Sequence, residues 1–278
     1  MIQRPRVGHI DFINCLPLSY AWNCDAYADG LEIVRATPAE LNQAVVEERL
    51  EASPVSSIIY ARKSENLLLL PDVSISAAGA LKSILLVAKR PIDELCQSRI
   101  ALTAKSATSH CLLKIILHQA YRATPDYFIS AQGLAEGVLD TAEAVLLIGD
   151  DALHAYYHRS AELYYYDIGA EWKKLTGLMM VYAVWVVNRD FALAQPEMIR
   201  RIAKCIHGGF AYGLQNLSAA AASLQGQKDF SIEQIVEYIG LLNYKLTDEH
   251  QAALLTYYQM ANELNLIDRV PKIQFAQV

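Results

Sequence analysis

The chain has 278 residues, which suits one large domain or two ordinary ones. Its residues are 53% hydrophobic and 19% charged, with 13 glycines and 9 prolines, which excludes disordered, collagen-like and disulfide-scaffold chains. The net charge is −6, and the Lys and Arg residues form no cluster in the sequence that would make a basic surface stripe. We therefore expect a small molecule or a protein as the partner, and neither nucleic acid nor a membrane.

Targeting segments and cysteine patterns point to a cytoplasmic chain without structural cross-links. The longest apolar run, at 178–187, has about half the length of a membrane-spanning helix and predicts a buried strand. The N-terminus lacks the continuous apolar core of a signal peptide, which predicts a cytoplasmic location. Five cysteines without a CxxC pair indicate neither a disulfide framework nor a zinc site.

Short apolar runs alternate with helical patterns over the first two thirds of the chain, which is typical of βα units and a mostly parallel sheet. Strands are predicted at 7–13, 31–36, 52–56, 66–70, 81–88, 99–103, about 126–129, 143–148, 163–167 and 179–187. Helices are predicted at 17–22, 38–49, 107–121, 150–157 and 169–176. After Asp190 the pattern is helical, at 196–216, 219–222, 232–240 and 248–264.

Several helix ends carry their own signals. Thr37 through Glu40 and Ser231 through Gln234 are capping boxes, and Gly177 is a typical C-terminal glycine. No Gly- or Pro-rich linker divides the chain between 120 and 160. We therefore expect interleaved lobes, in which the chain crosses over through the strand at 81–88 and returns through the strand at 179–187.

Small polar residues stand at four junctions where a predicted strand ends and a helix begins. These residues are Asn14, then Ser56 and Ser57, then Ser106, Thr108 and Ser109, and finally Gly149 and Asp150. Ligands of open α/β sheets bind at such junctions, because the N–H groups of helix starts attract anions. Helix capping and turn formation are the simpler explanations of each set taken alone. The position that all four sets share favours a binding site.

The histidines offer weaker candidates. His154 and His158 have the i, i+4 spacing of a zinc pair, but no acidic residue lies between them, which favours a solvated helix face. His9 is either a base in a cleft or a hydrogen-bonded strand residue. The sequence contains no GxGxxG, GxxxxGK[ST] or GxSxG motif, so dinucleotide, P-loop and α/β-hydrolase functions lack their usual signals.

Five segments of the chain are informative together: RVGHIDFINCLPL at 6–18, SPVSSIIYAR at 53–62, TAKSATSHCLLKIIL at 103–117, AVLLIGDDAL at 144–153, and DIGAEWKKLTGL through AVW at 167–185. In this order they resemble the chorismate dehydratase family of the futalosine route to menaquinone. The resemblance implies an α/β, two-lobed periplasmic-binding-protein-like (type II) fold with a ligand cleft between the lobes. It also implies that chorismate, a dicarboxylate, loses water to give 3-[(1-carboxyvinyl)oxy]benzoate without a cofactor or a metal.

The resemblance and the pattern together predict a larger discontinuous lobe, 1–84 with 184–278, and a smaller inserted lobe, 85–183. Asn14 and Ser83 match positions that the family uses against its substrate, and Ser106, Thr108 and Ser109 match its hydroxyl-rich anion loop. Ile59 and Met179 depart from the Glu and Pro that are common in the family.

The resemblance leads to a hypothesis about the reaction. The substrate's own enolpyruvyl carboxylate removes the ring proton while Asn14 and Ser83 orient the substrate, and His9 is the alternative base. The alternative functions are a cytoplasmic solute-binding or sensor protein for a small carboxylate, and the related 1,4-dihydroxy-6-naphthoate synthase. The sequence carries no signal for an oligomeric state.

Overall fold

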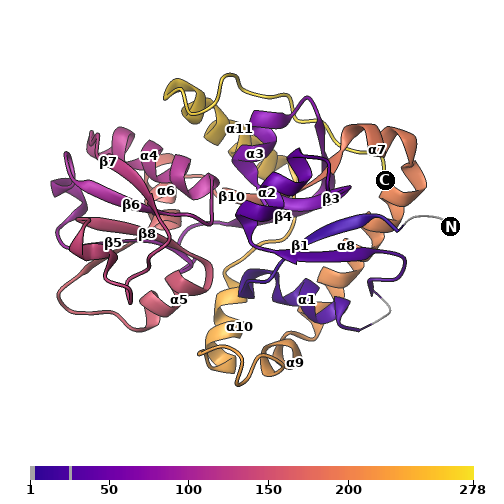
Figure 1. Ribbon diagram of the computed structural model, residues 1–278, viewed down its shortest axis with the longest axis horizontal. Helices are drawn as coiled ribbons and strands as arrows, with labels where there is room; N and C mark the ends of the chain where they lie inside the picture. Colours follow the sequence, from indigo (N-terminus) through magenta and orange to yellow (C-terminus); the bar gives the residue numbers. More distant parts are fainter. Residues whose placement is uncertain (1–3, 25–26) are drawn as a thin grey trace.

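The protein, described here by a computed structural model that covers residues 4–24 and 27–278, has two lobes, each built around a five-stranded sheet (Figure 1). The first sheet has the order β2-β1-β3-β10-β4, with β1 Arg6–Ile10, β2 Glu32–Ala36, β3 Ala52–Ser56, β4 Leu67–Ala77 and β10 Met180–Asn188. The second has the order β7-β6-β8-β5-β9, with β5 Ile84–Ala88, β6 Arg99–Thr103, β7 Asp126–Ser130, β8 Ala144–Ile148 and β9 Tyr164–Asp167.

Helices cover both faces of each sheet. In Figure 1, α3 and α11 lie above the first sheet and α1 and α8 below it, while α4 and α6 lie above the second sheet and α5 below it. The α-helices are α1 Leu16–Trp22, α2 Pro38–Val46, α3 Ser57–Lys63, α4 Thr108–Tyr121, α5 Gly149–Tyr157, α6 Ile168–Thr176, α7 Arg189–Ala194, α8 Pro196–Gln215, α9 Leu217–Ala222, α10 Ile232–Gly240 and α11 Asp248–Glu263. Short 3₁₀ turns are η1 Ile13–Cys15, η3 Ile92–Glu94 and η4 Val138–Asp140.

The sheets are mixed, which corrects the expectation of a mostly parallel sheet. β1 pairs in parallel with β2 and β3, and β6 pairs in parallel with β7 and β8. β10 and β5 run antiparallel to both of their neighbours. The reason is the path between the lobes: these two strands begin at the junction where the chain has just crossed, whereas their neighbours end there.

Most predicted elements are confirmed, with changes where local signals are weak. Both capping boxes form, and Gly177 ends α6 in a left-handed conformation with φ of 74°. The strand predicted at 81–88 begins only at Ile84, so the predicted strand serine Ser83 precedes it. β4 extends to Ala77, past the predicted end at 70, and the helices α3 and α7 were not predicted. The predicted bounds of the two lobes remain a prediction.

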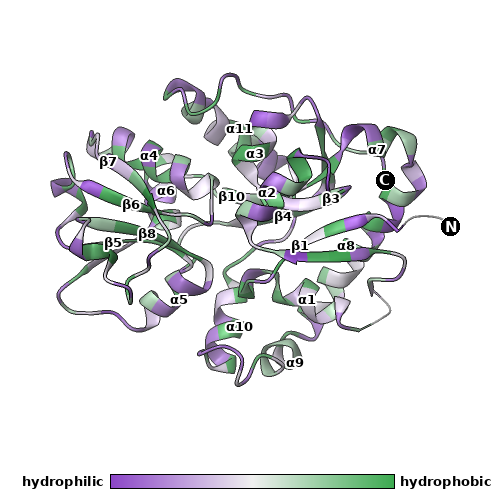
Figure 2. Ribbon diagram, in the orientation of Figure 1, coloured by the Kyte–Doolittle hydropathy of each residue, from purple (hydrophilic) through white to green (hydrophobic). Residues whose placement is uncertain are grey.

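Two short segments connect the lobes, 78–83 before β5 and 177–179 before β10. Asp167 holds the first of them, because its Oδ2 accepts hydrogen bonds from Leu81 N at 2.9 Å and Lys82 N at 2.7 Å. Lys82 has a positive φ of 66° at this bend. The strands β5 and β8 beside the bend are fully buried, and Figure 2 colours them as hydrophobic.

The helix α11 of the C-terminal region packs against the junction of the lobes. Tyr257 and Tyr258 of α11 donate hydrogen bonds to Thr108 O at 3.1 Å and Ser57 O at 2.7 Å, so α11 ties α3 to α4. Tyr257 also meets Trp172 of α6 edge to face, at 6.1 Å between ring centres. Among the described helices, none is both long and apolar enough to cross a membrane.

Candidate active site

A cavity of about 580 Å³, counting the open space at its mouth, lies between the two lobes. Strands of both sheets end or begin at it, including β1, β3, β8 and β10. Its lining residues are Ile10, Phe12, Asn14, Pro38, Ser56, Ile75, Leu81, Ser83, Ile84, Ser106, Thr108, Ser109, Ile148, Gly149, Tyr182, Ala183, Tyr238 and Leu242.

Seven of the nine residues predicted for the site line this one cavity. They are Asn14, Ser56, Ser83, Ser106, Thr108, Ser109 and Gly149. They come from both lobes and from the crossing segment, and each lies near the point where a strand ends or begins at the junction. Their functional roles remain predictions, but their convergence is a fact of the fold.

Asn14 offers an unpaired hydrogen-bond acceptor to the cavity. It lies in η1, and its backbone carbonyl accepts a 2.8 Å hydrogen bond from the Tyr244 hydroxyl, which holds this turn against the C-terminal region. Its side-chain Oδ1 is buried and has no partner among the described residues. A buried acceptor of this kind is satisfied when a ligand hydroxyl or N–H group donates to it.

Ser83 is held at the floor of the cavity from two sides. Its side chain accepts a 2.9 Å hydrogen bond from the Tyr238 hydroxyl, and its backbone carbonyl accepts one from Gly149 N at 2.8 Å. Only 4% of Ser83 is exposed. Because the Ser83 oxygen is the acceptor in its hydrogen bond with Tyr238, the Ser83 O–H group is free to donate a hydrogen bond to a ligand.

At the start of α4, capping and cavity lining occur together. Ser106 lies just before the N-cap residue Ala107, and its Oγ accepts a hydrogen bond from Ser109 N at 3.3 Å, in the first turn of the helix, and lies 2.8 Å from Ser109 Oγ. Thr108 Oγ1 accepts one from Ile58 N at 3.3 Å and thereby joins α4 to α3. These hydroxyls form a rigid polar wall at the positive end of a 14-residue helix.

Two predicted residues do not line the cavity. Ser57 is fully buried and donates a 2.8 Å hydrogen bond to Val181 O, which joins α3 to β10. Asp150 accepts hydrogen bonds from Ile13 N at 3.2 Å and Lys228 Nζ at 2.7 Å. Both residues connect elements around the cavity, and sequence alone does not separate such a contact from one with a ligand.

His9 also lies away from the lining residues. Ser19 Oγ donates to Cys15 O at 3.1 Å, so the 2.6 Å contact between His9 Nε2 and Ser19 Oγ needs the proton on Nε2. His9 is fully buried against Trp22, and burial, with a smaller effect of Arg35, lowers its pKa to about 3. This placement counts against His9 as the base.

Two tyrosines complete the cavity, and the sequence pattern did not single them out. Tyr182 lies within the apolar strand β10, and its hydroxyl is buried without a partner among the described residues. Tyr238 comes from α10, in the region after Asp190 that contains none of the five family segments. Burial raises the pKa of both hydroxyls, so both remain protonated hydrogen-bond donors. An i, i+2 strand pattern could have indicated which way Tyr182 points, but not that its strand borders a cavity.

The described residues that line the cavity include no Asp, Glu, His, Lys, Arg or Cys. The lining therefore offers a ligand hydroxyl donors and the N-terminus of α4, and it contains no cationic side chain. The same lining supplies no carboxylate or imidazole to remove a proton, and no usual set of metal ligands. Ile59 and Met179, which depart from the family pattern, are absent from the lining as well.

The two mixed sheets, the paired crossing segments and the cavity between the lobes define a periplasmic-binding-protein-like fold. A Candida albicans protein described as having the generic periplasmic binding protein fold superposes with a TM-score of 0.68 at 12% identity, over 100% of this chain and 98% of that one. The chain belongs to the menaquinone biosynthesis family, whose sequence profile matches residues 5–263.

Two curated relatives of this chain are both named chorismate dehydratase. A chorismate dehydratase of Thermus thermophilus is 35% identical over 176 residues, which are 58% of this chain and 63% of that enzyme. The aligned part thus covers less than two thirds of the Thermus protein. A chorismate dehydratase of Campylobacter jejuni is 25% identical over 93% of this chain and 98% of its own length.

Proposed function

We propose that this protein is a chorismate dehydratase, a carbon–oxygen lyase that converts chorismate to 3-[(1-carboxyvinyl)oxy]benzoate and water. The observation that carries the proposal is the cavity between the lobes, where Asn14 and several hydroxyl groups converge and the lining contains no carboxylate, imidazole or amine. Family membership and the names of the two relatives support the same reaction. The cytoplasmic location remains a prediction from the sequence.

Chorismate carries two carboxylates, and the cavity walls offer matching donors. In the proposed complex one carboxylate lies at the start of α4, against Ser106 and Ser109, where the helix dipole favours negative charge. Tyr182 lines the cavity from the first lobe, and its buried hydroxyl, which lies beside Gly169 at the start of α6 and has no partner among the described residues, is the further donor that we propose. This arrangement accepts a dianion although the whole chain has a net charge of −6, because local donors act at short range.

The proposed reaction is an elimination in which the substrate supplies the base. The enolpyruvyl carboxylate takes the proton from the ring carbon that bears the ether, and the C–H electron pair becomes a ring π bond. The C–O bond of the neighbouring hydroxyl breaks, and the leaving oxygen receives the proton and departs as water. Asn14 Oδ1 accepts from the leaving hydroxyl and fixes its direction, and Ser83 donates a hydrogen bond that orients the substrate. The product ring is aromatic, which makes the step favourable.

The direct test is turnover by the purified full-length chain. We expect chorismate, incubated without added cofactor or metal and with a chelator present, to yield the aromatic product, followed by ultraviolet absorbance and mass spectrometry. Chorismate that binds but stays unchanged would overturn the proposal in favour of a solute-binding protein. Turnover of a naphthoate-synthase substrate with no turnover of chorismate would overturn it in favour of the related synthase.

The roles of two residues can be tested separately. Asn14→Ala is expected to lower kcat by roughly 100- to 1,000-fold, the usual effect of losing one well-placed polar group, and Ser83→Ala by about tenfold or more. Ser53→Ala is the matched control, because Ser53 is equally buried but donates to Pro54 O and does not line the cavity. Full turnover by Asn14→Ala would rule out the proposed mechanism.

A further inference from the structure

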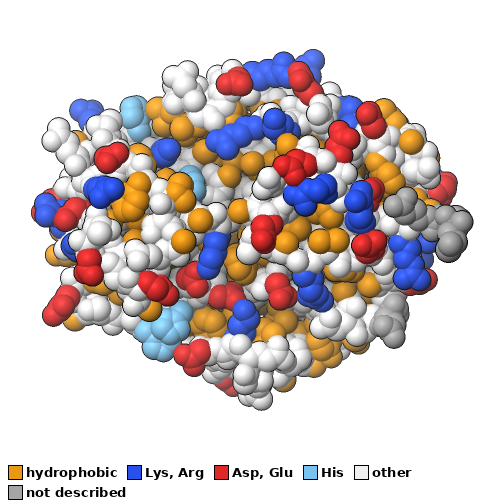
Figure 3. All heavy atoms as spheres, in the orientation of Figure 1, with side chains coloured by type: hydrophobic (Ala, Val, Ile, Leu, Met, Phe, Trp, Pro, Cys, Tyr) orange, Lys and Arg blue, Asp and Glu red, His pale blue; other side chains and the backbone are white. Residues whose placement is uncertain are grey.

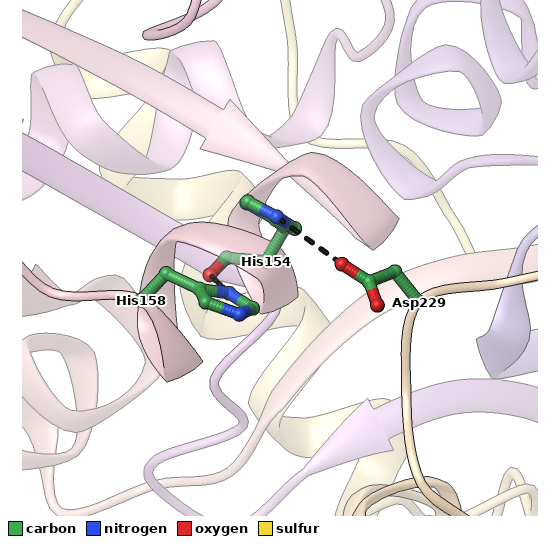
Figure 4. A group of neighbouring side chains, drawn as sticks. All are labelled: His154, His158 and Asp229. Carbon is green, nitrogen blue, oxygen red and sulfur yellow. Dashed lines mark hydrogen bonds and ion pairs between the residues drawn. The ribbon is translucent and has the colours of Figure 1, made fainter.

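A group of three metal-ligating side chains lies on the surface, outside the cavity. His154 and His158 stand one turn apart at the end of α5, and Asp229 faces them from the loop between α9 and α10 (Figure 4). Among the described residues, this is the group of His, Cys, Asp and Glu whose ligand atoms all lie within 4.8 Å of one another. Figure 3 shows histidine side chains gathered on the surface near α5.

Local contacts orient the two imidazoles for a shared ligand. His158 Nδ1 lies 3.0 Å from His154 O, and because a carbonyl can only accept, Nδ1 carries the proton. This leaves the Nε2 lone pair of His158 free, as in metal sites where a backbone carbonyl fixes the tautomer of a ligating histidine. The two rings stack at 4.2 Å between centres, which places both on one side of the helix.

Asp229 is available to the same site. Its Oδ2 lies 3.8 Å from His154 Nε2, a distance too long for a direct hydrogen bond. The neighbouring cation, Lys228, pairs with Asp150 at 2.7 Å instead. Ligands around a tetrahedral zinc ion lie about 3.4 Å apart, so small rotations of these exposed side chains bring all three into range.

The three ligands come from opposite lobes. His154 and His158 follow β8 of the second sheet, whereas Asp229 precedes α10, which packs against η1 of the first lobe. Two further contacts cross at the same place: Lys228 with Asp150, and the Tyr157 hydroxyl with Glu237 at 3.1 Å. α5 itself begins at Gly149, in the cavity wall. A ligand that joins these side chains therefore joins the two walls of the cavity.

We propose that His154, His158 and Asp229 form a binding site for a divalent transition metal ion of the zinc class, and that the bound ion clamps the two lobes together. Two imidazoles favour zinc, nickel or copper over magnesium and calcium, which prefer oxygen ligands. A water molecule completes the coordination, as is usual where the protein supplies three ligands. The site regulates access to the cavity, takes no part in the reaction, and stands independently of the proposed function.

Zinc binding to the full-length chain tests the site directly. After treatment with a chelator and its removal, isothermal titration with ZnCl₂ is expected to show one saturable site per chain. His158→Gln and Asp229→Asn should each weaken it by about tenfold or more, because even supporting groups around metal sites carry effects of that size. His118→Gln is the matched control, since His118 is an exposed helical histidine outside the group. Absence of saturable binding, or equal binding by the variants, would overturn the proposal.

The clamp has its own readout. Zinc that binds only when the lobes are closed is expected to raise the Tm of the wild-type protein by several degrees and the Tm of Asp229→Asn by clearly less. It should also reduce the radius of gyration in solution scattering wherever open molecules are present. A zinc-dependent rise in Tm that persists in full in Asp229→Asn would show that the two histidines act without the other lobe, and the clamp would be wrong. Neither measurement uses chorismate, so the result does not depend on the dehydratase assay.

Discussion

At the scale of single residues, two polar atoms of the cavity lining lack a partner. Asn14 Oδ1 and the Tyr182 hydroxyl are buried and have no partner among the described residues, as do His9 Nδ1, Trp185 Nε1 and His250 Nε2, which belong to residues outside the lining. Leaving such an atom unsatisfied costs about 1–3 kcal/mol, and a ligand that bonds to one in the lining recovers that free energy. Ser57 and Thr108 show the opposite case, because their hydroxyl groups are engaged in contacts between α3, α4 and β10.

The Tyr182 hydroxyl provides a prediction that separates binding from stability. Tyr182→Phe is expected to lower kcat/KM for chorismate by about 10- to 150-fold, the value of a hydrogen bond to a charged group. Its free energy of unfolding should stay the same or rise slightly, because an unpaired buried hydroxyl is removed. Steady-state kinetics and urea unfolding measure the two effects.

Tyr60→Phe is the matched control for Tyr182→Phe. The Tyr60 hydroxyl donates to Lys272 O and accepts from Gln274 N, each at 2.9 Å, and it lies outside the cavity. This variant should therefore lose about 1 kcal/mol of stability with unchanged kinetics. Unchanged kinetics for Tyr182→Phe would exclude contact between Tyr182 and the substrate.

At the scale of elements, the site depends on where strands end and helices begin. β1, β3 and β8 end at the cavity, and β5 and β10 begin there, so the polar residues next to these ends meet. Gly149 marks one such junction, with φ of 60° between β8 and α5. A Cβ atom at this position would lie 2.9 Å from the Phe12 ring, which itself lines the cavity.

Replacing this glycine should affect both stability and activity. Gly149→Ala is expected to cost about 1–3 kcal/mol of stability, from the left-handed backbone and the contact with Phe12. It should also lower kcat/KM, because the displaced Phe12 ring moves into the cavity. Gly177→Ala is the matched control, with φ of 74° but no atom within 4 Å of the added Cβ. It should cost about 1 kcal/mol and leave the kinetics unchanged, and equal kinetic effects of the two variants would contradict this account.

Secondary structure was predictable where a local signal was strong. The capping boxes at Thr37 and Ser231 and the glycine at 177 mark helix ends, because the bonds that stabilise those ends lie within a few residues. The start of β5 was misplaced by three residues because Leu81 and Lys82 bond to Asp167, which is distant in sequence. The direction of β5 and β10 depends on a route through both lobes, and no local pattern reports it.

At the scale of the whole molecule, buried neutral histidines link the fold to pH. His9 is the strongest case, because desolvation lowers its pKa to about 3, and burial also lowers the pKa of His110 and His250. Each of these histidines therefore binds a proton more readily in the unfolded chain than in the folded chain. The resulting stability is fully present above the unfolded pKa of about 6.5 and is lost as the pH falls from there toward 3.

The pH dependence gives a prediction about global unfolding. Through His9 alone, the free energy of unfolding should fall by about 1.4 kcal/mol for each pH unit below 6.5, or about 2 kcal/mol by pH 5. His9→Gln, which keeps a donor for Ser19, should show a smaller loss between pH 7 and 5 in urea unfolding. His118→Gln, at an exposed position, should follow the wild type. The same pH slope in His9→Gln and the wild type would show that His9 is not held neutral.

The sequence by itself determined the class of fold, most element positions and the set of small polar residues that line the cavity. Hydrophobic periodicity and helix caps could be interpreted because they involve residues close together in the sequence. The polar residues of the cavity could be identified because they lie in motifs shared with the family. Only the tertiary structure decided that Ser57, Asp150 and His9 make contacts outside the cavity lining, that Tyr182 and Tyr238 complete the lining, and that Asp229 meets the two histidines of α5. The contacts of Asp150 and Asp229 join separate lobes, those of Ser57 and His9 lie within one lobe, and all of them follow from the packing of the chain.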